Sequence, residues 1–155
     1  MKTQSGLFLA IDQSTSATKA MLFTPDGALL DNESLSHRQI YPRAGWVEHD
    51  AEEIYSNTIK TAQALLARQS GEWNNLLALS ITNQRETTVV WDKVTGEPLC
   101  NAIVWQDRRT APFCNELKNS GQENFIRKKT GLVADAYFSG TKLKWILDEI
   151  PGARK

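Results

Sequence analysis

Residues 7–23 read LFLAIDQSTSATKAMLF and consist of two apolar runs separated by a hydroxyl-rich turn. The first run, 7–11, leads into Asp12, and its unbroken apolar character is typical of a strand buried on both faces. The second run, 20–23, follows so closely that the two are expected to form a hairpin. A TPDG turn then precedes a third predicted strand over 28–36. The chain is therefore expected to open with a three-stranded meander.

The remaining sequence predicts helices interleaved with further strands. Asp50 followed by Glu53 resembles a capping box, which predicts a helix start at that point. The apolar face of this helix is expected to hold Ile54, Thr58, Ala62, Leu65 and Leu66. The later predicted elements are a buried strand over 76–81, a hairpin over 87–105, and helices over 108–119, 123–129 and 141–150. The order β-β-β-α-β, then a hairpin and helices, predicts an α/β fold around a mixed sheet.

The size and composition favour one ordinary globular domain. The chain has 155 residues, of which 41% are hydrophobic and 23% charged, with nine glycines and five prolines. These values argue against a disordered chain or a coiled coil. Eighteen basic residues balance eighteen acidic ones. A dedicated nucleic-acid binder needs a clustered excess of Lys and Arg, so no nucleic-acid partner is expected.

The cysteines and histidines are too few for a structural zinc site. Cys100 and Cys114 do not form a CxxC pair, and the chain has only two histidines. So few cysteines, with no signal peptide, favour a cytoplasmic location. The apolar run 7–11 is too short to span a bilayer, so no membrane partner is expected either.

The turn at 12–19, DQSTSATK, is the first candidate for chemistry. Hydroxyls and main-chain N–H groups in such a turn can converge on phosphate oxygens, and a carboxylate at a strand end can hold Mg²⁺ through water. The turn lacks the spacing of a P-loop. Ser and Thr are also ordinary turn formers, so the turn alone leaves a purely structural role open.

Three further candidates are polar or aromatic residues at strand ends and in one loop. Arg85 and Glu86 follow a predicted strand and place five donors beside two acceptor oxygens, which suits vicinal hydroxyls. Trp105 ends an apolar strand and could line a sugar or polyol site. Tyr137 lies in a glycine-bounded loop. Taken singly, each is a weak signal, because an isolated Arg-Glu pair is more often a surface ion pair and a large aromatic such as Trp105 is more often part of the core.

Taken together, the motifs resemble the FGGY carbohydrate kinases, and within that family the glycerol kinases. The turn at 12–19 resembles the first phosphate motif of the sugar-kinase/actin superfamily. The other matching stretches are YPRAGWVEHD (41–50), ITNQRETT (81–88), NAIVWQDRR (101–109) and YFSGTKLKWIL (137–147). The resemblance implies the ribonuclease-H-like fold of the actin-type ATPases. It also implies transfer of the γ-phosphoryl group of Mg-ATP to the 3-hydroxyl of glycerol.

The resemblance assigns roles residue by residue. Arg85, Glu86 and Tyr137 are expected to bind the polyol hydroxyls, with Trp105 as an apolar wall against the carbon chain. Thr15, Ser16 and Lys19 are expected to contact the nucleotide phosphates, and Asp12 to serve Mg²⁺ through water. Two positions depart from the family pattern, which has glycine at Ser14 and arginine at Lys19. Lysine keeps the charge but lacks the planar fork of a guanidinium.

The resemblance also predicts that residues 1–155 are an incomplete N-terminal FGGY domain. The second, nucleotide-binding domain and the catalytic base are expected to lie outside this chain, which alone is expected to lack useful turnover. Full-length members of the family are expected to be homo-oligomers. Three alternatives stay open: a kinase for another polyol or sugar, a non-catalytic polyol-binding or regulatory module, and a nuclease in which Asp12 and Glu86 share a metal.

Overall fold

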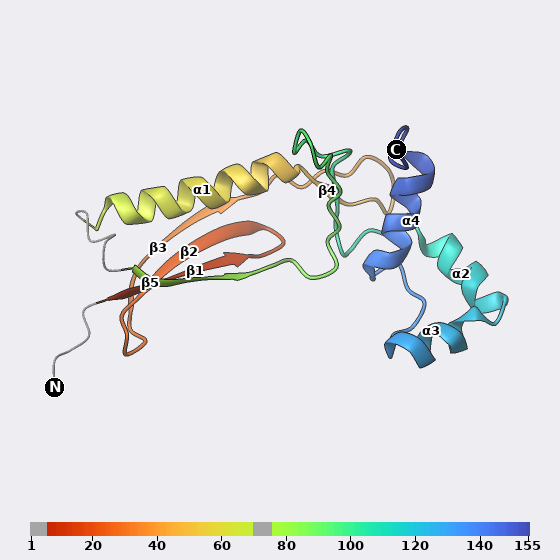
Figure 1. The fold of residues 1–155 in the computed structure, drawn as a ribbon, viewed down its shortest axis with the longest axis horizontal. Helices are drawn as coiled ribbons and strands as arrows, with labels where there is room; N and C mark the ends of the chain where they lie inside the picture. Colours follow the sequence, from red (N-terminus) through yellow and green to blue (C-terminus); the bar gives the residue numbers. More distant parts are fainter. Residues whose placement is uncertain (1–5, 70–75) are drawn as a thin grey trace. The chain divides into compact units, whose positions relative to one another are not determined.

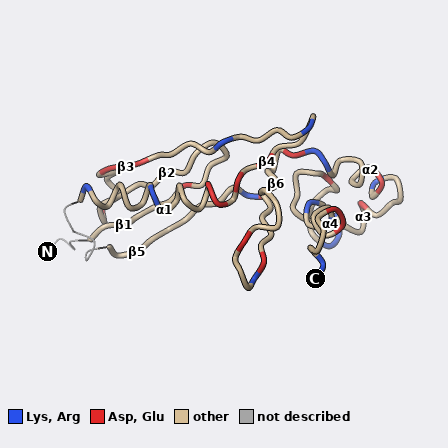
Figure 2. Tube along the Cα trace, turned by 90° about the horizontal axis from the view of Figure 1, so that it is seen from above, with Lys and Arg blue, Asp and Glu red and all other residues tan. Residues whose placement is uncertain are grey.

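A computed structural model describes residues 6–69 and 76–155. The chain forms two compact units, which are treated separately below. The first comprises 1–38 and 52–84, and the second comprises 39–51 and 85–155. Lys and Arg are interspersed with Asp and Glu in both units (Figure 2). Within the described residues, no helix combines the length and the apolar character needed to cross a membrane.

The first unit is built on a four-stranded mixed sheet with the order β3-β2-β1-β5 (Figure 1). Its strands are β1 (Leu7–Gln13), β2 (Ala17–Phe23), β3 (Leu29–Ser36) and β5 (Leu76–Thr82). The predicted meander is confirmed, because β1 pairs antiparallel with β2, and β2 with β3. After the helix α1 (Ala51–Ala67) the chain returns to pair β5 parallel to β1. The β-β-β-α-β order is therefore confirmed.

Helix α1 covers one face of this sheet (Figure 1). Alternate residues of β1 and β2 point to that face, and Leu65 and Leu66 of α1 pack among them. The buried cluster consists of Leu7, Leu9, Ile11, Ala20, Leu22, Leu65 and Leu66. The early turns of α1 bury Asn57 and Thr61 rather than the predicted Ile54 and Thr58. These polar side chains are satisfied locally: Asn57 donates to the Ser36 carbonyl, and Thr61 to the Asn57 carbonyl.

The prediction that residues 76–81 form a buried strand is right about the strand and wrong about its burial. In β5, Leu79 is 53% exposed and Ile81 is 61% exposed. The strand lies at the edge of the sheet. Its register places Leu79 opposite Leu9 and Ile81 opposite Ile11, so these side chains lie on the face that α1 covers over the neighbouring strands. An apolar run reports hydrophobic residues but not where the sheet ends.

The second unit contains three helices and only short strands. Short strands β4 (Glu48–His49) and β6 (Ala102–Ile103) pair antiparallel. The hairpin predicted over 87–105 is reduced to single bridges that join Thr88 to Ile103 and Trp91 to Pro98. The helices are α2 (Ala111–Asn119), α3 (Gln122–Thr130) and α4 (Ser139–Glu149). Gly121, at φ +77°, ends α2 as the sequence predicts, because glycine adopts this left-handed conformation without strain.

The buried face of helix α4 includes a lysine. Its buried residues are Lys142 and Ile146, whereas Leu143 and Leu147 remain 42% and 37% exposed. Lys142 and Ile146 are four residues apart and therefore lie on the same side of the helix. The apolar periodicity located the helix correctly but missed that a lysine belongs to its interior face.

Candidate functional site

The turn between β1 and β2 is closed by Ser14. Its main-chain N–H donates to the Ala17 carbonyl at 3.0 Å, and its hydroxyl donates to the same oxygen at 2.9 Å. The Ala17 N–H donates in return to the Ser14 hydroxyl at 3.2 Å. Ser14 therefore has a local structural role at the position where the family pattern has glycine.

Neighbouring side chains of this turn divide between the two faces of the sheet. Gln13 and Thr18 lie opposite each other and face α1: Gln13 donates to the Thr58 hydroxyl at 2.6 Å and accepts from Thr18 at 2.8 Å. Asp12 and Lys19 also form a cross-strand pair, one position further along, and so lie on the opposite face. Helix α1 does not cover that face.

The polar residues on the open face fit the predicted phosphate and metal roles. Asp12 is half-buried and Lys19 is exposed, and Thr82 of β5 lies beside Asp12 in the parallel register. Thr15 and Ser16 lie in the turn itself, half-buried and exposed respectively. Within 6–69 and 76–155, no cluster of three or more His, Cys, Asp or Glu side chains could enclose a metal ion. A single carboxylate at an open edge is a setting in which Mg²⁺ keeps most of its waters.

The second unit holds Glu86 in an unusual conformation. Among the described residues, Glu86 is the only non-glycine residue at positive φ (+64°). The left-handed region costs a side-chain-bearing residue roughly 1–3 kcal/mol and persists only where neighbours hold it. Such strain is concentrated at functional sites, so the conformation supports the choice of Glu86 as a site residue.

Glu86 is fixed through one oxygen of its carboxylate. Oε2 accepts both the main-chain N–H and the hydroxyl of Ser139, each at 2.8 Å. Ser139 is the first residue of α4, so the carboxylate also lies at the positive end of the helix dipole. No side chain or N–H of the described residues donates to Oε1, which leaves that oxygen for a ligand hydroxyl.

The main chain around Glu86 is held by Lys142. Its ammonium donates to the carbonyl of Glu86 at 2.8 Å and to the carbonyl of Tyr137 at 2.6 Å. Burial lowers the pKa of Lys142 to about 8, and the charges of Glu86, Asp107 and Asp135 oppose that shift.

Two predicted aromatic residues lie together in the same unit. The rings of Trp105 and Tyr137 meet edge to face, with centroids 5.9 Å apart, and Tyr137 meets Phe138 in the same way at 5.1 Å. The Asp135 carboxylate accepts the Tyr137 N–H at 2.8 Å, and this bond, with Arg108 nearby, holds the pKa of Asp135 below its usual range. Tyr137 is therefore positioned from both sides, by Asp135 and by Lys142.

The second unit also contains a buried ion network. Asp107, 1% exposed, accepts the N–H groups of Val47 and Arg109 and a pair of guanidinium bonds from Arg109. Arg109 also bonds Glu48 at 2.7 Å. Its guanidinium lies over the rings of Trp46 and Trp145, at 3.8 and 4.5 Å from their centroids. The network joins 46–48 to 107–109 within the second unit.

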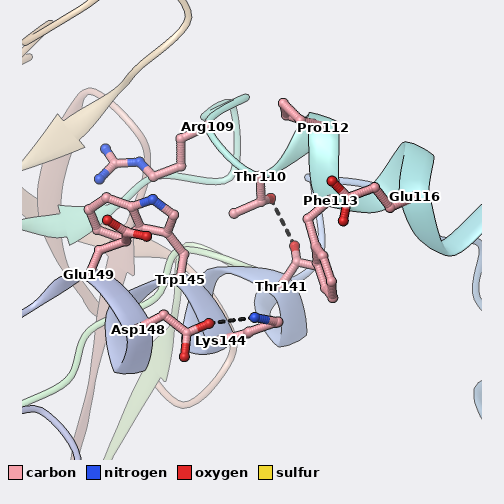
Figure 3. A pocket seen from close by; sticks show the side chains of 10 residues that line it. All are labelled: Arg109, Thr110, Pro112, Phe113, Glu116, Thr141, Lys144, Trp145, Asp148 and Glu149. Carbon is pink, nitrogen blue, oxygen red and sulfur yellow. Dashed lines mark hydrogen bonds and ion pairs between the residues drawn. The ribbon is translucent and has the colours of Figure 1, made fainter.

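A pocket of about 260 Å³ lies next to this network but contains none of the predicted site residues (Figure 3). Thr110 of its lining bonds Thr141 at 2.8 Å, and Lys144 pairs with Asp148. The candidate polyol site is therefore defined by the Glu86 turn and the Tyr137 segment rather than by this hollow.

The structure brings together Glu86, Trp105 and Tyr137 in the second unit, while Asp12, Thr15, Ser16 and Lys19 belong to one turn of the first. Arg85 precedes Glu86 in the same turn and is exposed. Sequence reasoning missed Ser139 and Lys142. Lys142 was detectable in principle, because it stands four residues before Ile146 on an apolar helix face.

Comparisons with known proteins identify the family of the chain. The chain is 57% identical over 150 residues to the glycerol kinase of Symbiobacterium thermophilum, a match that covers 97% of this chain and 30% of that protein. It is 54% identical over 147 residues to a glycerol kinase of Thermoanaerobacter, covering 95% of this chain and 30% of the relative. The chain thus spans about 30% of the length of these curated relatives.

Solved structures give the same result. The crystal structure of Plasmodium falciparum glycerol kinase with ADP matches at a TM-score of 0.91 and 34% identity, covering 97% of this chain and 30% of that one. A xylulose kinase from Lactobacillus acidophilus matches at 0.80 and 23% identity, over 93% and 29% of the two chains, which shows the fold alone. The predicted α/β fold of the sugar kinases is confirmed. The family model for the N-terminal domain of the FGGY carbohydrate kinases matches residues 7–155, and this chain therefore belongs to that family.

Proposed function

We propose that this chain supplies the polyol site and one phosphate-binding turn of an ATP-dependent kinase that phosphorylates a terminal hydroxyl of glycerol. The observation that carries the proposal is the Glu86 carboxylate, with Oε2 fixed by Ser139 and Oε1 available. Identities of 51–57% to proteins named glycerol kinase favour glycerol over other polyols.

The polyol residues divide the recognition between them. Glu86 accepts a hydrogen bond from one polyol hydroxyl through Oε1. Arg85, beside it in the turn, donates hydrogen bonds to hydroxyl oxygens from its planar guanidinium group. The Trp105 and Tyr137 rings supply an apolar surface against the carbon chain, and the Tyr137 hydroxyl adds a polar contact. A small polyol offers these groups in alternation, since each carbon carries both a C–H face and a hydroxyl.

The turn at 14–16 and its flanking strands serve the nucleotide. Thr15 and Ser16 offer hydroxyls and main-chain N–H groups to phosphate oxygens, and Lys19 adds a positive charge on the same face as Asp12. Asp12 would hold Mg²⁺ through water, and the metal would supply neutralisation of the phosphate charge. Phosphoryl transfer depends mainly on positioning and charge stabilisation, which these residue types provide. No residue of this chain is assigned as the general base.

The full gene product that carries this sequence provides the test. ADP formation is followed in a coupled assay with ATP and Mg²⁺, with glycerol, xylulose, gluconate or no acceptor. We expect glycerol-dependent ADP formation, sn-glycerol 3-phosphate as product, and lower kcat/KM for the two other acceptors. Absence of acceptor-dependent ADP formation would contradict the kinase proposal, and a preference for xylulose or gluconate would contradict glycerol as the substrate.

A further inference from the structure

Lys142 is a charged side chain in a place where the fold needs only an apolar one. It is 0% exposed and occupies the interior face of α4 with Ile146. A methionine would fill a similar volume there without the cost of removing an ammonium group from water. Such a residue calls for an explanation beyond packing.

The two carbonyl groups that accept hydrogen bonds from Lys142 belong to the two segments that carry predicted polyol residues. The ammonium donates to the Glu86 carbonyl at 2.8 Å and to the Tyr137 carbonyl at 2.6 Å. Glu86 is the residue held at φ +64°, so its carbonyl direction is set by a conformation that needs support. One side chain therefore joins the strained turn to the segment that carries the Tyr137 ring.

The surrounding charges partly offset the cost of burying this amine. Burial lowers the pKa of Lys142 to about 8, whereas Glu86, Asp107 and Asp135 favour the protonated amine and Arg109 opposes it. Hydrogen bonds from a charged donor are shorter and stronger than neutral ones, and they strengthen further in a desolvated setting. Ser139, three residues earlier on α4, holds the Glu86 carboxylate, so one helix end fixes both the main chain and the side chain of Glu86.

We propose that Lys142 is a positioning residue of the polyol site, which sets the spacing between the Glu86 carboxylate and the Tyr137 ring without touching the substrate. The inference rests on the proposed polyol-kinase function and deepens it. A merely structural lysine would stabilise the second unit and affect all kinetic constants together. A positioning lysine affects the polyol constants selectively, because the nucleotide residues lie on the first unit.

The test compares three variants of the full gene product. Lys142→Met removes the donor and keeps most of the side-chain volume. Lys144→Met makes the same chemical change two residues further along, at an exposed surface ion pair with Asp148. Ile146→Ala destabilises the same helix face through an apolar residue that cannot form a hydrogen bond. The KM values for glycerol and ATP, kcat and the thermal midpoint are measured for each.

We expect Lys142→Met to raise the KM for glycerol at least tenfold while the KM for ATP stays within twofold. Lys144→Met should match the wild type, and Ile146→Ala should lower the thermal midpoint without the selective rise in glycerol KM. If Lys142→Met does not fold, Lys142→Gln, which removes the charge and shortens the side chain by one atom, takes its place with the same expectation.

The proposal is overturned if a folded Lys142 variant keeps the wild-type KM for glycerol, or if its constants change together as in Ile146→Ala. It is also overturned if neither Lys142 variant folds, because the residue is then a stability element. Failure of the proposed function is a separate result: the wild-type protein itself then shows no glycerol-dependent ADP formation, and glycerol titration calorimetry on wild type and Lys142→Met decides whether polyol binding still depends on Lys142.

Discussion

Ser139 donates both its main-chain N–H and its hydroxyl to the same oxygen of Glu86, each at 2.8 Å. Two donors hold Oε2 at the start of α4 and leave Oε1 without a hydrogen bond from the described residues. The orientation of the proposed polyol ligand thus depends on a residue 53 positions away in the sequence.

Replacing Ser139 with alanine removes one of these two donors and keeps the other. We expect the KM for glycerol to rise about tenfold. A hydrogen bond to a charged group contributes roughly 1.5–3 kcal/mol, and the low end of this range applies because the main-chain donor remains. The KM for glycerol is measured by steady-state kinetics of the full gene product. Ser120→Ala is the matched control, because the Ser120 hydroxyl donates only to the nearby Leu117 carbonyl at an exposed helix end. Equal effects of the two variants would contradict the orienting role of Ser139.

Arg85→Ala removes the proposed fork of donors from the polyol site. We expect the KM for glycerol to rise by a factor of about 100 with an unchanged thermal midpoint, because Arg85 is exposed and its loss leaves no buried group unsatisfied. Arg127→Ala on the exposed side of α3 is the control. An unchanged KM for glycerol in Arg85→Ala would rule out its role in binding the polyol.

The meander of the first unit could be predicted from the sequence because its strands follow one another directly along the chain. The run 7–11, the turn with Ser14 and the run 20–23 are contiguous, so their pairing needs no long-range information. The exposure of Ile81 was not predictable in this way, because it depends on which strand lies at the sheet edge. In the second unit, β6 pairs with β4, which lies some fifty residues earlier in the chain. The strand pairing of this unit was therefore predicted less accurately.

The candidate site shows the same difference between local and long-range features. Arg85, Glu86, Trp105 and Tyr137 could be proposed as site residues from the sequence, because residue type and motif point to them. Ser139 and Lys142 act through the main chain or carboxylate of Glu86 across more than 50 residues, and only the fold reveals such contacts. The spacing of residues in the sequence does not indicate that Ser139 or Lys142 contacts Glu86.

Lys19→Arg restores the residue that the family pattern has at this position. Lys19 is exposed on the open face of the sheet, opposite Asp12, so a longer side chain meets no steric obstacle within the strand pair. We expect the KM for ATP to fall about 2–5-fold, because a guanidinium binds phosphate oxygens in pairs whereas an ammonium acts as a point charge. The KM for glycerol should not change. An unchanged KM for ATP would contradict a contact between Lys19 and the phosphates.

Asp107→Asn tests the buried ion network of the second unit. The change removes the charge that faces Arg109 and replaces an acceptor oxygen with an NH₂ group, which cannot accept from the Val47 or Arg109 donors. We expect a loss of about 3–5 kcal/mol in the free energy of unfolding, the usual cost of breaking a buried pair. Urea unfolding measures it. Asp148→Asn, at an exposed ion pair, should leave the midpoint unchanged, and equal effects of both variants would contradict the prediction.

The stability contributed by Lys142 should rise with pH. Burial lowers the pKa of Lys142 to about 8 in the folded protein, whereas a lysine in an unfolded chain titrates near about 10.4. Between these values the unfolded state binds more protons than the folded state, so the free energy of unfolding increases with pH in that window and is flat below about pH 7. Relative to Lys142→Met, in which the same carboxylates and Arg109 remain, we expect the wild type to gain roughly 1–2 kcal/mol between about pH 7 and pH 9.5. Urea unfolding of both proteins at these two pH values measures the difference. A difference that falls with pH, or does not change, would show that the buried amine is not held at a depressed pKa.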